Sequence, residues 1–130
     1  RFSMLEVGLK GEVSKVVQAE DTAARVASGL LEVFSTPMMI ALMEKAAYTL
    51  AEEHLEEGES TVGVEIGSKH MKATPIGVTV KAVATITKIE GRFITFQVQA
   101  FEEDGTLIGE GTHLRCIINR QKFIDKLNKR

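Results

Sequence analysis

A chain of 130 residues that is 44% hydrophobic and 26% charged has the composition of a globular protein, and we expect residues 1–130 to form one domain. The formal net charge of −2 arises from mixed signs and aromatic residues make up only 5%, so the composition predicts no nucleic-acid partner. No apolar run approaches the ~20 residues of a membrane span and no signal-peptide pattern opens the chain, which together with the single cysteine predicts a cytoplasmic protein without a membrane partner.

The first third of the chain contains one predicted strand and one apolar connection. Apolar residues alternate within residues 5–24, and residues 11–17 ("GEVSKVV") are the best strand candidate. Residues 25–34 ("RVASGLLEVF") form a short apolar connection, for which a lid is one interpretation.

A helix of roughly twenty residues is predicted next, with a start and a stop signal. Thr36 has the side chain of a good N-cap, Pro37 suits the first helical position, and Gly58 closes the predicted end.

The remainder of the chain predicts a run of antiparallel strands. Turns are expected at Glu90-Gly91 and at Asp104-Gly105, a strong hairpin signal, and a bend is expected at Gly67. The predicted strands cover residues 60–73, 77–90, 92–103 and 106–119, and a short polar helix or a frayed end covers 120–130. One long helix and a meandering sheet form an α+β pattern, and a curved sheet wrapped around the helix would cover its apolar surface.

One charged residue of the predicted helix, Glu44, departs from the helical pattern. On a helical wheel the polar face comprises Lys45, Thr49, Glu52, Glu53 and Glu56, and the predicted core face comprises Met39, Ile40, Met43, Ala47, Leu50 and Ala51. Glu44 falls between these faces, at the border of the core. A partly desolvated carboxylate there is a candidate base or nucleophile; the alternative is a boundary residue whose head group reaches water.

The histidines and the cysteine favour no metal or cofactor. His54, His70 and His113 lack metal-ligand spacing, and the chain contains one cysteine, so neither a zinc site nor another cofactor is predicted. Structural roles are the alternative for all three histidines. Cys116 lies in "HLRCII", for which an inert core thiol is favoured over a nucleophile.

Four segments together resemble the hot-dog-fold thioesterases and, among them, the fluoroacetyl-CoA thioesterase family. They are "VFSTPMMIALMEKAA", "VGVEIGSKHMKATPIGVTV", "KIEGRF" and "GEGTHLRCII", within residues 33–127. The resemblance implies a hot-dog fold and hydrolysis of a small acyl-CoA. It also implies a catalytic set of Thr36 at the head of the helix, Glu44 eight residues later and His70 in the next strand, with the backbone N–H of Gly63 near the thioester carbonyl.

The resemblance leaves the chemistry of Glu44 and the acyl group open. Glu44 would either attack the carbonyl or act as general base on water. The family's lid carries a phenylalanine linked to recognition of the fluorinated acyl group, whereas the corresponding stretch here has Leu30 and Leu31. We therefore expect hydrolysis of short acyl-CoAs in general, with Leu30 and Phe34 as substrate contacts. Arg115 is a further candidate contact, to the CoA phosphates or the lid; a surface charge is the alternative.

The family is also similar in pairing two sheets edge to edge, which implies a homodimer, with a dimer of dimers as a further possibility. In such a dimer His70 would face Glu44 of the second copy. Two competing functions are a non-catalytic hot-dog module that binds an acyl-CoA or similar ligand, and a hydratase of the same fold. Binding alone does not need the set of Thr36, Glu44 and His70, and the Asp-x-x-x-x-His pattern of the hydratases is absent.

Overall fold

The computed structural model describes residues 4–130; residues 1–3 of the predicted domain lie outside the described part. In chain order the elements are β1 (Lys10–Val16), the 3-10 turn η1 (Ala19–Asp21), α1 (Thr36–Glu52), β2 (Glu59–His70), β3 (Thr79–Glu90), β4 (Phe93–Glu102), β5 (Leu107–Asn119) and α2 (Arg120–Asn128). The predicted strands and the helical tail are all present, and none of their ends shifts by more than three residues.

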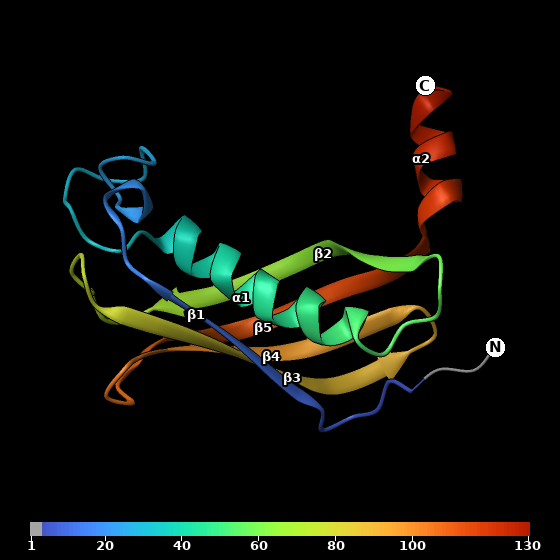
Figure 1. The fold of residues 1–130 in the computed structure, drawn as a ribbon, viewed down its shortest axis with the longest axis horizontal. Helices are drawn as coiled ribbons and strands as arrows, with labels where there is room; N and C mark the ends of the chain where they lie inside the picture. The colour runs from blue at the N-terminus through green and yellow to red at the C-terminus, as the bar shows by residue number, and fades with distance from the viewer. Residues whose placement is uncertain (1–3) are drawn as a thin grey trace.

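The five strands form one antiparallel sheet in the order β1-β3-β4-β5-β2. Helix α1 lies across one face of the curved sheet, and the core fills the space between them (Figure 1). The sheet supplies fully buried side chains such as Phe96 and Ile108, which pack with Met39 and Met43 of the helix. The predicted α+β architecture, a long helix wrapped by an antiparallel sheet, is confirmed.

The start and the end of α1 differ from the prediction. The N-cap is Ser35, whose Oγ accepts a hydrogen bond from the Met38 N–H, so Thr36 is the first helical residue and not the cap. The helix ends at Glu52, before the predicted stop at Gly58. Acidic residues crowd this segment, and negative charge at a helix C-terminus opposes the helix dipole. Gly58, with φ +86°, belongs to the turn into β2 instead.

The buried face of α1 also includes two residues outside the predicted core face, Leu42 and Ala46. Ile40, which the wheel placed in the core, is partly exposed. Glu44 is at the border of the buried stripe, as predicted, with 37% of its side chain exposed.

Strand β2 is one edge of the sheet, because it pairs with β5 on one side only. The strand runs on through Gly67, as predicted, and Gly67 pairs with Thr112; the register shifts between Gly63 and Glu65. A bulge re-aims the residues beside it, and here it lies next to Gly63.

Helix α2 projects from the end of β5, and none of its residues is buried (Figure 1). Beside its start, Cys116 is half-buried on the face of β5 that points away from α1, so the predicted core position of this thiol is wrong. Among residues 4–130, no helix has the length and apolar character needed to cross a membrane.

Candidate active site

The hydroxyl of Thr36 faces His70 at one end of α1. Thr36 Oγ1 lies 2.8 Å from Nδ1 of His70, the last residue of β2, and the two groups form a hydrogen bond. Because Ser35 caps the helix, the Thr36 hydroxyl has no capping bond to make and is available to the histidine.

A hollow of about 240 Å³ opens beside this pair. Its wall includes Phe34, which is 1% exposed and packs edge-on against the His70 ring with the centroids 6.4 Å apart. The hollow is lined by Ala23, Ser28, Val33, Phe34, Thr36, His70, Met71, Lys72 and Ala73. Leu30 is not in the lining and is 94% exposed. The segment 22–34 thus lines the hollow through Ala23, Ser28, Val33 and Phe34, while its two leucines are exposed.

Burial lowers the pKa of His70 below its ordinary value, because desolvation disfavours the imidazolium; the Lys72 backbone raises the pKa by less. His70 is therefore poised as a neutral imidazole near pH 7. Its Nε2 is buried and has no hydrogen-bond partner among the described residues. Buried polar atoms of native proteins are nearly always paired, so this nitrogen marks a place where another group can bind.

The carboxylate of Glu44 lies over Gly63 and beside Arg115. Its Oε2 is 3.5 Å from Nη1 of Arg115 and 3.8 Å from Nε2 of His113. A Cβ placed on Gly63 would come within 3.0 Å of the same oxygen and within 3.3 Å of Arg115 Nη1. Only a glycine leaves the carboxylate this close to the backbone of β2.

The guanidinium of Arg115 is fixed by Thr61. Nε donates to Thr61 Oγ1 at 2.8 Å, and Nη2 donates to the Thr61 carbonyl at 3.2 Å. The guanidinium carbon Cζ lies 5.5 Å from the centroid of the Tyr48 ring, a cation–π distance. Arg115 is 7% exposed, so the surface-charge alternative for this residue is wrong. The charge is instead held inside, next to Glu44.

His113 completes this group as a neutral hydrogen-bond relay. Its Nδ1 donates to the Glu65 carbonyl at 2.8 Å, so Nε2 is free to accept from Arg115 Nη1 at 3.1 Å. Burial lowers the pKa of His113, and the neighbouring Arg115 cation lowers it further against the opposing effect of Glu44. The contact between His113 and Glu44 is therefore not an ion pair, and Arg115 is the cation that faces the carboxylate.

The candidate residues thus fall into two groups within one chain. Thr36, His70 and Phe34 line the hollow at the start of α1, whereas Glu44, Gly63 and Arg115 meet near its middle. The eight residues from Thr36 to Glu44 separate the groups by about 12 Å along the helix axis.

Two members of the Glu44 group were missed from the sequence. Thr61 holds Arg115, and Tyr48 stacks on it. Thr61 carried a signal, because strand alternation places it on the same face as Gly63. Tyr48 lies one helical turn after Glu44, where residues share a face.

Within residues 4–130, no group of three His, Cys, Asp or Glu side chains is placed to hold a metal ion. The chemistry available to the site is that of a carboxylate, a neutral imidazole, a hydroxyl, a guanidinium and backbone N–H groups.

Known proteins resemble the chain over most of its length. The family model for fluoroacetyl-CoA-specific thioesterases matches residues 17–121. A fluoroacetyl-CoA thioesterase of Streptantibioticus cattleyicolor is 40% identical over 100 residues, which are 76% of this chain and 70% of that protein. The solved structure of the fluoroacetyl-CoA thioesterase FlK superposes with a TM-score of 0.89 at 32% identity, covering 97% of each chain. A thioesterase superfamily member of Thermus thermophilus superposes with a TM-score of 0.88 at 28% identity, covering 95% of this chain and 91% of that one.

The fold and the site together define a thioester hydrolase of the hot-dog class. Within that class, the chain belongs to the fluoroacetyl-CoA-specific thioesterase family. The fold and the family expected from the four sequence segments are both confirmed.

Proposed function

We propose that this protein hydrolyses small acyl-CoA thioesters in the cytoplasm as a homodimer, with Thr36, Glu44 and His70 as its catalytic residues. The observation that carries the proposal is the Glu44 carboxylate, which lies next to the backbone of Gly63 and 3.5 Å from the buried Arg115. This arrangement offers a base or nucleophile and a donor of hydrogen bonds at one point.

Hydrolysis needs a nucleophile or base, a donor to the oxyanion and a group that positions the water. The leaving group needs little help, since a thioester is already activated and its thiolate leaves readily. Glu44 either attacks the carbonyl carbon, forming a mixed anhydride that water then hydrolyses, or removes a proton from the attacking water. The Gly63 N–H faces the developing oxyanion, where the loss of one donor typically costs about 10²–10³ in rate. His70, held by the Thr36 hydroxyl, positions the water and takes or returns a proton.

A homodimer would bring the two groups of residues together. Thr36 and His70 lie about 12 Å along α1 from Glu44 of the same chain, and the buried Nε2 of His70 lacks a partner among the described residues. In an edge-to-edge dimer, Glu44 of a second copy would fill that position. The free edge of β2 supports this pairing, as does the apolar surface around it, where Val64, Tyr48 and Met71 are 40–53% exposed.

The hollow at Thr36 and His70 would bind the acyl-thioester end of the substrate. Its volume of about 240 Å³ suits a small acyl group. Phe34 forms part of its wall, and Leu30 would contact the substrate or the second copy after movement of the lid. Burial of Arg115 beside Glu44 favours a contact to the acyl end over a contact to the CoA phosphates. Variants of the relative FlK have been solved with fluoroacetate and CoA and with acetyl-CoA.

Thiol release from a panel of acyl-CoAs tests this proposal. The panel runs from fluoroacetyl and acetyl to medium-chain and aromatic acyl groups, and we expect activity on the short members. Leu30 and Leu31 provide no aromatic ring in the lid, so we expect fluoroacetyl-CoA to be preferred over acetyl-CoA by less than about 10²-fold, or ~2.7 kcal/mol.

The Glu44→Gln variant is the matched control for the panel. The amide keeps the size of the side chain and removes the base, so we expect thiol release to stop while the protein stays folded. The thermal midpoint should fall, because the buried Arg115 loses its counter-charge. Near-normal turnover of Glu44→Gln would exclude Glu44 from the mechanism. Acyl-CoA binding without hydrolysis of any member would favour the non-catalytic module.

A further inference from the structure

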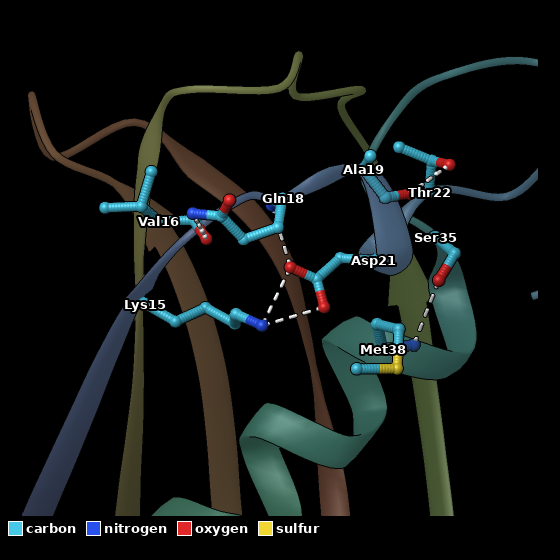
Figure 2. A network of polar contacts seen from close by, with 8 residues as sticks. All are labelled: Lys15, Val16, Gln18, Ala19, Asp21, Thr22, Ser35 and Met38. Atoms are coloured by element: carbon cyan, nitrogen blue, oxygen red, sulfur yellow. Dashed lines mark hydrogen bonds and ion pairs between the residues drawn. The ribbon is translucent and has the colours of Figure 1, made fainter. Parts of the chain in front are cut away.

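The carboxylate of Asp21 is buried, and the proposed chemistry does not use it. Its side chain is 1% exposed. Nζ of Lys15 lies 2.7 Å from both of its oxygens, and the Gln18 N–H donates to Oδ2 at 2.8 Å (Figure 2). Buried ion pairs add little stability compared with apolar residues of the same volume, because desolvation offsets their attraction. Removal of one partner would nevertheless be costly, because the other charge would lose its counter-charge.

Lys15 points inward although it lies on an edge strand. The side chains of β1 alternate between exposed and half-buried positions, and Lys15 shares the inward parity with Val13 and with the fully buried Val17. Its side chain is 32% exposed, so the ammonium retains some contact with water while it holds Asp21. Lys15 is thus a charged residue on the inward side of β1, and the group that it contacts there is the Asp21 carboxylate.

A short path of hydrogen bonds leads from Asp21 to Thr36. The Asp21 carbonyl accepts the Ser35 N–H at 3.0 Å. The Ser35 hydroxyl caps α1 through the Met38 N–H, as Figure 2 shows. The next residue is Thr36, whose hydroxyl bonds to His70. Displacement of Asp21 would therefore move the first turn of α1, and with it the Thr36 hydroxyl.

The region around Asp21 and Ser35 also holds both ends of the segment 22–34. Thr22 pairs with Phe34 in an isolated bridge, and its hydroxyl donates to the Ala19 carbonyl at 2.8 Å. On the other side, the Phe34 N–H donates to the Thr74 carbonyl at 2.8 Å. The residues between 22 and 34 thus form a loop with a fixed base, and Asp21 is the residue immediately before that base.

We propose that Lys15 and Asp21 are positioning residues of the thioesterase: the pair fixes η1 against β1 and thereby holds the Thr36 hydroxyl in place for His70. Neither residue touches the substrate. The inference rests on the catalytic role proposed for Thr36, and it assigns to this buried pair a function in turnover rather than in folding.

The test is a double-mutant cycle between Asp21→Asn and Thr36→Ala, with thiol release as the assay. The asparagine retains the shape and can still accept from the Gln18 N–H, but it lacks the charge that holds Lys15. We expect Asp21→Asn alone to lower kcat about tenfold with KM within about twofold, since misplacement of a catalytic group costs up to about 10²-fold. In the Thr36→Ala background the same change should lower kcat less than about twofold.

Two controls separate positioning from general damage. Glu12→Gln breaks an ion pair of the same strand, between Glu12 and Lys81 at 3.8 Å, in which both side chains are exposed; it should leave kcat unchanged. Lys15→Arg keeps the charge and should retain most of the wild-type rate. If Asp21→Asn fails to fold, Lys15→Gln replaces it in the cycle, with the same expected loss.

The outcomes distinguish this inference from the proposed function. If Thr36→Ala is slow but Asp21→Asn is folded and turns over like the wild type, only the positioning role is wrong. An equal loss in both backgrounds also overturns it, because Asp21 would then act independently of Thr36. If Thr36→Ala itself is fully active, the catalytic role of Thr36 fails and the positioning role fails with it.

Discussion

The hydroxyl of Thr36 is bonded to His70 and not to its own helix. The 2.8 Å distance between Thr36 Oγ1 and His70 Nδ1 joins the first residue of α1 to the last residue of β2. Capping is done by the preceding residue, Ser35. Two adjacent hydroxyl residues thus have separate tasks, which substitution can examine one at a time.

Thr36→Ala should lower activity, whereas Ser35→Ala should lower stability. Thr36→Ala removes the bond to His70 and leaves the cap, so we expect kcat to fall at least about tenfold with little change in the thermal midpoint. Ser35→Ala removes the cap and should cost about 1 kcal/mol of unfolding free energy. Thr36→Ser retains the hydroxyl and should retain most activity. Thermal unfolding and thiol release on the three variants check this; equal activity of Thr36→Ala and the wild type would contradict it.

Gly63→Ala should abolish activity without unfolding the protein. The new Cβ would lie 3.0 Å from Glu44 Oε2 and 3.5 Å from Cε1 of His113, so the carboxylate must move away from the backbone N–H. We expect kcat/KM to fall by at least about 10²-fold. Gly67→Ala is the matched control, because it lies on the same strand with nothing within 4 Å of its Cβ. A similar loss in both variants would indicate a general sensitivity of β2.

Folding stability should fall as the pH falls below about 6.5, the ordinary pKa of histidine. Burial lowers the pKa of His113 and of His70. Between the folded and the unfolded pKa values, the unfolded chain therefore binds more protons, and the unfolding free energy rises with pH. The stabilisation is complete above the unfolded pKa and is lost as the pH falls toward the folded one. Thermal midpoints measured from pH 7.5 to pH 5 test this.

The His113→Asn variant provides the control for the pH experiment. Its amide nitrogen can still donate to the Glu65 carbonyl, but it does not titrate. We expect the variant to be less stable than the wild type at pH 7.5 and to show a shallower decrease at low pH. An identical pH dependence in the two proteins would mean that His113 does not contribute to it.

Element type was predictable from the sequence, whereas the ends of α1 were not. Period-2 alternation and the turn residues Gly91 and Gly105, both with positive φ, define the strands locally. The helix start has two adjacent capping candidates, Ser35 and Thr36, and the pattern with Pro37 at the first helical position favoured Thr36, which is wrong. In the folded protein the Ser35 N–H donates to the Asp21 carbonyl, a tertiary contact that the local sequence pattern does not contain.

The site was predictable only as a set of residue types. Family resemblance picked out Thr36, Glu44 and His70, but their grouping depends on the third dimension: the axial rise of α1 separates Thr36 from Glu44. The inward direction of Arg115 depends on Thr61, which lies 54 residues earlier in the chain. Strand alternation places Thr61 on the face of Gly63, but it does not show that Thr61 meets Arg115.

The separation of the two groups leads to a complementation experiment between two inactive variants. If His70 of one copy acts with Glu44 of the other, each dimer has two sites, and each site takes one residue from each chain. A heterodimer of His70→Ala and Glu44→Gln chains then has one site with both residues intact and one site with neither.

Mixing the two inactive variants after dissociation and reassociation should therefore restore activity. Random pairing makes half of the dimers heterodimers, and each has one of two sites intact, so we expect about one quarter of the wild-type rate. Each variant alone, taken through the same procedure, should remain inactive. If His70 and Glu44 of the same chain formed the site, every site in the mixture would lack one of them and no activity would return. Light scattering on the mixture must show dimers, because an active monomer would exclude a shared site altogether.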